Sequence, residues 1–279
     1  MMTPGDIGYI TSIVGEDRVS RDSLDLLCYS RDLGASIPDE LLKGYGMVGA
    51  ELVVRPKSIE QLSKIAGYAY GKNIPLTPRS AGSWALGGVL PMDGGIVLDL
   101  CGMSSILELS EDDEWVRVEG GVVWKRLVDW LEARGFQPGA NPSSGASATV
   151  GGFVGTGGSA GIGVPKYGTI GDQIISLKVV LSDGRVVETN PWDSWVFAGS
   201  EGTLGMVAEA TLKVFRLKKR QHLMYGFDRV ESGARAVDKL YRLKPYNFTF
   251  FNRGMVELMA EVGGDLPRKE FTLAMTIDG

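Results

Sequence analysis

The sequence contains a single histidine, His222, among its 279 residues. One histidine excludes a metal site built from several histidines, and it excludes any Ser-His-Asp machinery that needs a second one. Cysteine is nearly as scarce, because only Cys28 and Cys101 occur, far apart and in no metal-binding spacing. We therefore expect no metal site and a reduced chain in the cytoplasm.

Positive charge is not in excess, and long apolar runs are missing. The formal net charge of −5 gives no reason to expect nucleic acid or an anionic membrane as a partner. No apolar stretch approaches the roughly 18 residues of a membrane span. The first residues, MMTPGDIGYI, lack a basic segment followed by an apolar one, so we expect no signal peptide and a soluble globular chain.

Glycine is plentiful, and it is densest over residues 142–171, where ten of thirty residues are glycine. Glycine is favoured where φ is positive or where a ligand touches the main chain. The stretch therefore predicts backbone wrapped against a large flat or negatively charged ligand. A flexible linker is the alternative, but Val150, Phe153, Val154 and Ile162 are residues that linkers rarely carry.

A second small-residue loop, Pro78 to Trp84, follows a predicted strand–helix–strand unit. The strands are expected over 48–55 and 74–77, with a helix capped by Ser58 and ended by Gly71 between them. Ligands commonly sit beyond the carboxyl ends of such strands. Consecutive N–H groups in the loop predict a concavity for phosphate oxygens, with a tight glycine turn as the alternative.

Three units are predicted along the chain. Residues 1–44 are expected to form a helical lead, and residues 45–217 carry the glycine-rich loops. Glycine thins out afterwards, and residues 218–279 read as strand, helix, strand, helix and strand. That last unit is close to the lower size limit for a self-sufficient core.

The glycine loops and their neighbours together resemble the FAD-binding domain of FAD-linked oxidases, the vanillyl-alcohol oxidase or p-cresol methylhydroxylase type. The similarity is greatest to the subgroup of the glycolate oxidase FAD subunit and the D-lactate dehydrogenases. The segments that carry it follow the family's order and spacing over roughly residues 28–217. They are YSRDLG (29–34), PRSAGSWALGG (78–88), GGIVLDL (94–100), SATVGGFVGTGGSAG (147–161), KYGTIGD (166–172), LKVVLSDGRVV (177–187) and GSEGTLGMVAEATLKV (199–214).

The resemblance implies an α+β fold in which a two-subdomain FAD-binding domain (PCMH-type) is followed by a small, partial α/β cap. FAD would lie between the two subdomains, its pyrophosphate on the loop 78–84. The residues implied to contact FAD are Pro78, Arg79, Ser80, Ala81, Gly82, Ser83, Trp84, Ser143, Ser144, Gly145, Ala146, Ser147, Ala148, Thr149, Gly152, Thr156, Gly157, Gly158, Ser159, Glu201, Gly202, Thr203, Gly205 and Val207.

The sequence departs from the family at the positions that attach flavin covalently in other members. Ser83 stands where a histidine of the first loop could sit, and residues 142–171 contain no cysteine. Non-covalent FAD is therefore expected. Ser80 replaces the glycine of the family's usual arginine–glycine pair, where a positive φ would suit glycine better.

The implied activity is that of an FAD-dependent oxidoreductase, or its FAD-carrying subunit, which oxidises a 2-hydroxy acid such as glycolate or D-lactate. Electrons would pass to an iron–sulfur subunit or a quinone. The alternative is a flavin-binding module that needs a partner chain to complete the site, since apolar surface on residues 220–279 predicts an oligomer or partner. A third possibility, the molybdenum-hydroxylase FAD subunit or the enolpyruvyl reductase, is disfavoured by the GSEGTLG and KYG segments.

No catalytic residue is assigned from the sequence. Tyr167 and Lys166 are candidates for the flavin neighbourhood, although a structural tyrosine beside a glycine turn is the simpler interpretation, and Lys166 suits a phosphate or carboxylate. We expect Glu201 to hold its loop through main-chain hydrogen bonds and His222 to be structural. The remaining expectations concern packing: the cluster of Trp192, Trp195 and Phe197 in the core, and Cys28 and Cys101 buried.

Overall fold

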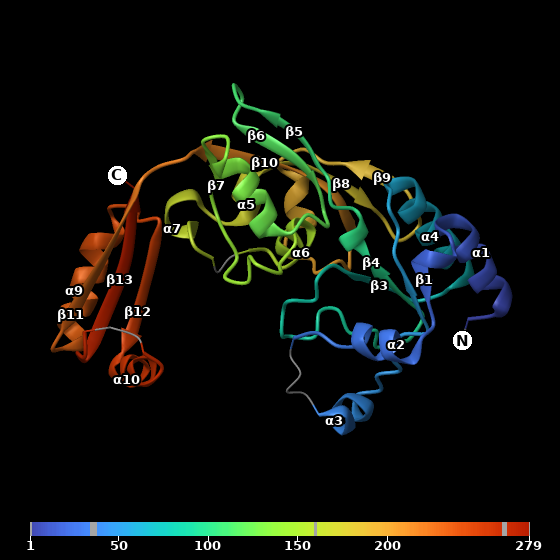
Figure 1. Cartoon of the computed structure of the whole chain (residues 1–279), viewed down its shortest axis with the longest axis horizontal. Coiled ribbons are helices and arrows are strands. Elements are labelled where there is room, and N and C mark those ends of the chain that lie inside the picture. The colour runs from blue at the N-terminus through green and yellow to red at the C-terminus, as the bar shows by residue number, and fades with distance from the viewer. Residues whose placement is uncertain (1, 34–37, 159–160, 264–266, 279) are drawn as a thin grey trace.

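The computed structural model describes residues 2–33, 38–158, 161–263 and 267–278, which form a mixed α+β fold with three sheets (Figure 1). The first sheet has the order β1 (Val19–Ser20), β2 (Leu52–Val54), β4 (Ile96–Asp99) and β3 (Leu76–Arg79). Strands β2, β4 and β3 run parallel, and β1 pairs antiparallel with β2. The expected strand–helix–strand unit is β2–α4–β3, and β4 lies between its two strands.

Helices α1 (Pro4–Val14) and α4 (Ile59–Lys72) pack together beside the first sheet. Ser58 caps α4 as expected, since its hydroxyl accepts a hydrogen bond from Gln61 N at 3.3 Å. The predicted end at Gly71 is wrong. The helix continues to Lys72 because Asn73 takes the left-handed conformation, φ 53°, that ends it.

The remaining short elements of the N-terminal part of the chain lie around the first sheet. They are the 3₁₀ turn η1 (Glu16–Arg18), the helices α2 (Ser23–Tyr29) and α3 (Asp39–Gly44), and the 3₁₀ turn η2 (Leu100–Gly102) directly after β4. Ile10 of α1 is fully buried in the core of this sheet, so the N-terminal segment shares a core with the strands. The boundaries at 44 and 217 stay predictions.

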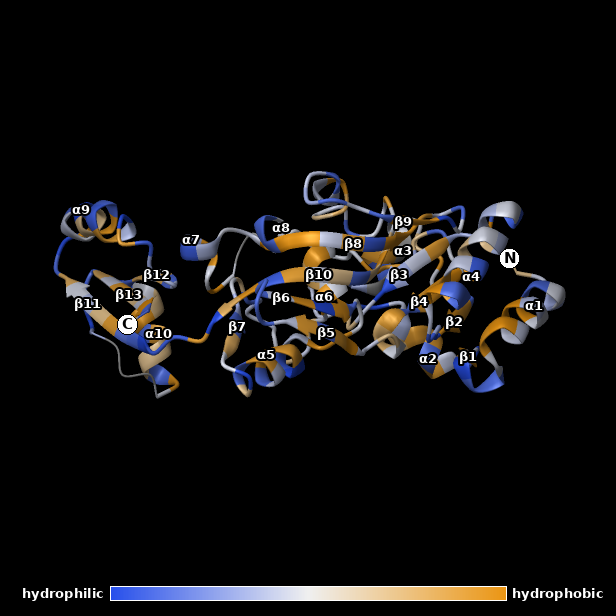
Figure 2. Ribbon diagram, turned by 90° about the horizontal axis from the view of Figure 1, so that it is seen from above, coloured by the Kyte–Doolittle hydropathy of each residue, from blue (hydrophilic) through white to orange (hydrophobic). Residues whose placement is uncertain are grey.

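The second sheet is antiparallel, with the order β5 (Ile106–Ser110), β6 (Trp115–Glu119), β10 (Met206–Arg216), β8 (Ile174–Val180) and β9 (Val186–Glu188). Strand β7 (Phe136–Pro138) pairs with the far end of β10. Around this sheet lie α5 (Trp124–Glu132), α6 (Val150–Gly155), α7 (Val164–Tyr167), α8 (Ile170–Gln173) and the 3₁₀ turn η3 (Asp193–Val196). Apolar residues concentrate on β8 and β10 in Figure 2.

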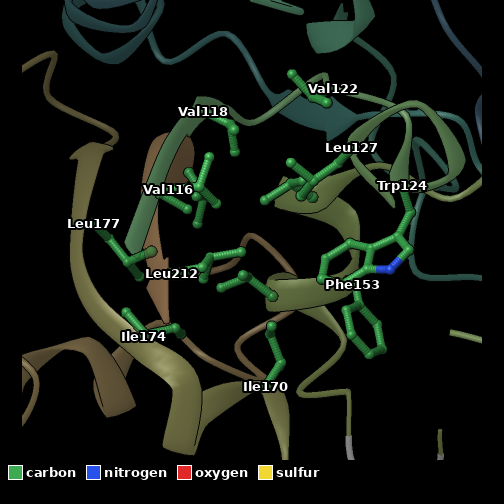
Figure 3. Packing of buried hydrophobic residues seen from close by; sticks show 14 of the residues in the cluster. Val116, Val118, Val122, Trp124, Leu127, Phe153, Ile170, Ile174, Leu177 and Leu212 are labelled. Atoms are coloured by element: carbon green, nitrogen blue, oxygen red, sulfur yellow. The ribbon is translucent and has the colours of Figure 1, made fainter. Parts of the chain in front are cut away.

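The core of the second sheet is built from alternate residues of its strands and one face of each covering helix (Figure 3). Trp124 of α5 and Phe153 of α6 meet edge to face with ring centroids 4.8 Å apart. Leu212 of β10 is 2% exposed, and Val116 is fully buried. Each such aliphatic side chain contributes about 1.5–3 kcal/mol by leaving water, so this core fixes where α6 lies.

The third sheet, the cap, projects away from the other two (Figure 1). Its strand order is β11 (Arg220–Phe227), β13 (Phe271–Asp278) and β12 (Asn247–Asn252), all antiparallel to their neighbours, with α9 (Val230–Tyr241) and α10 (Arg253–Glu261) as connections. The sequence predicted each of these five elements, with bounds shifted by a few residues. The prediction of a mixed α+β fold ending in a small α/β cap is confirmed.

One ionic cluster joins the cap to the second sheet. Asp278, whose side chain is 2% exposed, pairs with Lys166 and lies 3.5 Å from Arg220. Tyr167 donates its hydroxyl to Asp278 Oδ2 at 3.1 Å. Tyr246 lies below the guanidinium of Arg220, 3.6 Å from ring centroid to Cζ. These contacts fix the segment around Tyr167 against β13.

Among the described residues, none of the helices combines the length and the apolar character needed to cross a bilayer.

Substitution of Gly121 by alanine is predicted to destabilise the fold. Gly121 lies between β6 and α5, and a Cβ there would come within 2.2 Å of Leu100 O and 2.6 Å of Met103 O, both main-chain atoms. We expect Gly121→Ala to lower the free energy of unfolding by more than about 2 kcal/mol, measured by urea unfolding.

The matched control is Gly71→Ala, because Gly71 lies inside α4 and its added Cβ meets nothing within 4 Å. Alanine should raise the free energy of unfolding there by roughly 0.5–1 kcal/mol. Equal unfolding midpoints for the two variants would contradict the close approach of η2 to the start of α5.

Candidate cofactor site

A cavity of about 280 Å³ is lined by residues from both the first and the second sheet. Three segments that are far apart in sequence form most of its walls: 78–84 at the end of β3 and just after it, 142–158 around α6, and 197–207 before and within β10. The first two walls belong to the stretches 78–84 and 142–171, which the sequence predicts to touch a ligand, and the third belongs to the matched segment 199–214 and the residues just before it.

The first wall, residues 78–84, contributes all seven of its residues to the lining. Arg79 ends β3 in register with Asp99 of β4, so the loop begins at the carboxyl end of the parallel strands. Gly82 takes a positive φ of 61°, whereas Ser80 does not. Serine therefore fits at position 80 without the strain that the comparison with an arginine–glycine pair suggested.

The second wall is the short helix α6 and the turn before it. Thr149 caps the helix by accepting a hydrogen bond from Gly152 N at 3.2 Å. The inner side is pressed against the sheet, because Gly151 N donates to Gly120 O at 2.7 Å. The outer side is open, since a Cβ on Gly155 would meet no atom closer than Glu201 Cα at 4.0 Å. A ligand can therefore reach the main chain of α6.

The third wall leans on α6 through main-chain hydrogen bonds. Gly199 N donates to Val154 O at 3.0 Å, and Glu201 N donates to Gly155 O at 2.8 Å. Glu201 has a positive φ of 52°, which costs a non-glycine residue free energy and is found where the surroundings impose it. The expected main-chain role of Glu201 is present in the structure.

The structure brings most of the predicted contact residues to this one cavity. Those that line it are Pro78, Arg79, Ser80, Ala81, Gly82, Ser83, Trp84, Ser143, Ser144, Ala148, Thr149, Gly152, Thr156, Gly158, Glu201, Gly202, Gly205 and Val207. Ser159 lies outside the described residues. Whether each of them touches FAD stays a prediction.

Five predicted residues do not line the cavity: Gly145, Ala146, Ser147, Gly157 and Thr203. The first three lie in a turn that packs on the start of α5 instead, where Lys125 N donates to Gly145 O at 2.9 Å. Thr203 is engaged locally, since its hydroxyl donates to Ser200 O at 2.6 Å.

The structure adds lining residues that sequence reasoning did not select: Asp32, Gly88, Val89, Leu100, Pro142, Gly151, Phe153, Gly155, Phe197, Ser200 and Met206. Most fall within the matched segments, so extending each loop by a few residues would have found them. Phe197 is 9% exposed and belongs to the core while also facing the cavity.

The tryptophans beside Phe197 are not buried as expected. Trp192 is 85% exposed and Trp195 is 49% exposed, because η3 lies on the outside of the second sheet. Cys28 is likewise exposed on α2, which corrects the prediction of a buried thiol. Cys101 is partly covered, and burial raises the pKa of its thiol to about 12, so it stays protonated at neutral pH.

Tyr167 and Lys166 lie in the junction with the cap and do not line the cavity. Burial, together with the charge of Asp278, raises the pKa of Tyr167 to about 12. Its ring also packs on Phe215 with centroids 4.2 Å apart. A hydroxyl that is protonated at neutral pH and donates to a carboxylate fits the structural interpretation of Tyr167.

His222 lies on β11, where Nδ1 is 3.0 Å from Thr276 Oγ1. It lines a second cavity at the junction, of about 360 Å³, together with Arg220, Asn141 and Tyr246. Within the described ranges, no group of three or more His, Cys, Asp or Glu side chains is placed to hold a metal ion.

The walls of the first cavity fit an extended dinucleotide. Glycine and serine bring three stretches of main chain within reach, and among the described lining residues Arg79 supplies the positive charge. Burial lowers the pKa of the Arg79 guanidinium, and the nearby Tyr29 and Asp99 oppose that change. A cavity whose lining includes both open main chain, at Gly155, and a positive charge suits a phosphate-containing ligand.

The model of the FAD binding domain family matches residues 50–190. The chain is 29% identical over 228 residues to the glycolate oxidase subunit GlcD of Bacillus subtilis (strain 168), covering 76% of this chain and 48% of that protein. It is 30% identical over 225 residues to the D-lactate dehydrogenase of Archaeoglobus fulgidus, covering 77% and 50%. The chain thus spans about half the length of the curated relatives it matches.

The fold is also that of a solved enzyme structure. An alkyldihydroxyacetonephosphate synthase superposes with a TM-score of 0.84 at 20% identity, covering 100% of this chain and 60% of the synthase chain. At this identity the match shows the fold alone. It confirms the predicted fold class, and this chain corresponds to 60% of the synthase chain.

A side chain at position 155 should block the ligand without disturbing the fold. In Gly155→Val the Cβ meets no atom closer than Glu201 Cα at 4.0 Å, and we expect the side chain to occupy ligand space and FAD affinity to fall at least about 10-fold. The measurement is quenching of flavin fluorescence on titration of the apoprotein with FAD.

The control is Gly71→Val, which places the same side chain on a helix far from the lining residues. It should leave FAD affinity unchanged. Equal affinity for Gly155→Val and the unmodified chain would show that FAD does not lie against α6.

Proposed function

The chain belongs to the FAD binding domain family, and on this premise we propose that it carries the FAD of an oxidoreductase acting on a 2-hydroxy acid such as glycolate or D-lactate. The observation that carries the proposal is the single cavity in which three separated small-residue loops meet. Relatives named glycolate oxidase subunit and D-lactate dehydrogenase support the substrate class.

Each wall has a distinct part in holding the cofactor. The loop 78–84 offers main-chain N–H groups and the charge of Arg79 to the pyrophosphate. Helix α6 presents bare main chain, and Phe197, Met206 and Val207 of the third wall give apolar surface that keeps water out. Bound FAD supplies the hydride acceptor for the substrate C–H bond.

The lining is built for binding more than for proton transfer. Its ionisable side chains among the described residues are Asp32, Arg79 and Glu201. Asp32 accepts a hydrogen bond from Gly87 N at 2.7 Å, and Glu201 lies over Gly88, so both serve the loops. We therefore place recognition of the substrate carboxylate on the cap side of the cofactor.

A second candidate function is a flavin-carrying module whose site another chain completes. Strands β11 and β12 are the edges of the three-stranded cap sheet, and Phe250 on β12 is 58% exposed. Leu258 on α10 is 57% exposed. Apolar surface next to open strand edges favours contact with further protein, such as a second copy or an iron–sulfur subunit.

Denaturation is expected to release the flavin. The cavity lining contains no histidine and no cysteine among the described residues, so it offers none of the side chains implied for covalent attachment. After reconstitution with FAD, precipitation in acid should leave the yellow colour in the supernatant. Flavin that stays with the polypeptide, detected by absorption of the redissolved pellet, would contradict the non-covalent assignment.

Reduction of the bound flavin tests the substrate class. We expect anaerobic addition of D-lactate or glycolate to bleach the visible flavin band, because hydride transfer to FAD removes that absorption. Pyruvate, which has no hydrogen at the reacting carbon, is the matched control and should leave the band intact. A stable bound flavin that no 2-hydroxy acid reduces, while dithionite does, would favour the module over the oxidase.

A further inference from the structure

The segment 29–33 forms a frame for the first wall of the cavity, although it precedes that wall by almost fifty residues. Three consecutive residues each hold the loop 79–87 by one hydrogen bond. The contacts are Arg79 Nη1 to Arg31 O, Gly87 N to Asp32 Oδ2 at 2.7 Å, and Leu33 N to Gly82 O at 3.2 Å. Two of them fix the main chain of the loop, and the third fixes the side chain of Arg79.

Tyr29, at the start of this segment, is itself held firmly. Its hydroxyl donates to Asp99 Oδ2 at 2.6 Å. Asp99 is 7% exposed, and its other oxygen accepts a hydrogen bond from Cys101 N at 3.0 Å. Arg55 Nε lies 3.6 Å from the same carboxylate. The position of the Tyr29 ring is therefore set by buried groups of the first sheet.

The guanidinium of Arg79 lies over the ring of Tyr29. Arg79 Cζ lies 5.2 Å from the ring centroid, a cation–π distance. Arg79 Nη2 lies where a Cβ on Gly82 would be only 2.5 Å away, so the guanidinium fills the space left by that glycine. Arg79 Nη1 donates to the main-chain oxygen of Arg31, and Arg79 lines the cavity, so its charge is presented to a ligand there.

We propose that Tyr29 is a positioning residue for FAD, whose ring holds the Arg79 guanidinium against Gly82 so that its charge faces the cofactor pyrophosphate. The inference rests on the proposed FAD-carrying function and extends it to a residue outside the cavity lining. Arginine has many rotamers, and a ring beneath it restricts them before the ligand arrives. Tyr29 then acts only through Arg79.

A double-mutant cycle measures this dependence. In Tyr29→Leu the ring is lost, and we expect FAD affinity to fall roughly 3- to 30-fold, the range of a partly desolvated cation–π contact. In an Arg79→Ala background the same Tyr29→Leu change should have no further effect. Affinities are measured by fluorescence titration of each apoprotein with FAD, after circular dichroism confirms folding.

Two further variants separate positioning from stability. Tyr29→Phe keeps the ring and removes the bond to Asp99, so FAD affinity should stay within about 2-fold even where the melting temperature falls. Tyr68→Leu is the matched control, because Tyr68 is also half-buried beside the first sheet and donates to an aspartate, Asp6 Oδ1, at 2.7 Å. It should lower stability without weakening FAD binding.

Independent, additive losses for Tyr29→Leu and Arg79→Ala would overturn the proposal, as would Arg79→Ala without effect on FAD affinity. If Tyr29→Leu does not fold, Tyr29→Phe decides alone: a loss as large as that of Arg79→Ala would place the effect in the hydroxyl and reject the ring. Failure of the proposed function looks different, because the unmodified chain would then bind no FAD.

Discussion

Contact between main chains at the start of α6 is the constraint on which the cofactor cavity depends. Gly120 N donates to Ala208 O, and Gly151 N donates to Gly120 O, both at 2.7 Å. A Cβ on Gly120 would lie 2.3 Å from Val207 O, and one on Gly151 would lie 3.0 Å from Gly120 O. Glycine suits this approach because it has no side chain. The turn at Gly120, strand β10 and the start of α6 therefore lie directly against one another through their main chains.

The consequence is a helix whose two sides have different uses. The inner side of α6 packs on the sheet through Val150, Phe153 and Val154, all 6% exposed or less. On the outer side, Gly152 and Gly155 line the cavity, and a Cβ on Gly155 would meet no atom closer than 4.0 Å. Because the inner contacts are main-chain and apolar, the helix is held rigidly enough to present its main chain to a ligand.

Local composition predicted main chain wrapped against a ligand, and the resemblance of these segments to FAD-linked oxidases implied the fold class and the cofactor. Small residues after a parallel strand at 78–84 and the run of glycines at 142–171 leave a visible pattern. The sequence did not predict the exposure of Trp192, because an aromatic side chain is expected in the core unless the position of η3 is known. It likewise ended α4 at Gly71, where Asn73 supplied the left-handed residue.

The role proposed for Tyr29 shows why contacts between residues far apart in the sequence cannot be predicted from sequence patterns. In the sequence, the YSRDLG segment stands out only through its resemblance to the family, and its own composition indicates a surface loop. Its use emerges when the first sheet places Asp99 beneath Tyr29 and Arg79 above it, residues that are 70 and 50 positions away. A side chain that acts by holding another has no periodicity or spacing of its own.

These contacts suggest different functions for the two packed sheets and for the cap. In the proposed function, main chain and one positioned arginine hold the dinucleotide, and the walls of the cavity rest on the buried cores of the first two sheets. The cap is joined to them through the ionic cluster at Asp278 and keeps exposed apolar residues at its strand edges. We therefore assign cofactor binding in the proposed function to the two packed sheets, and the choice of substrate to the surface that the cap and its neighbours provide.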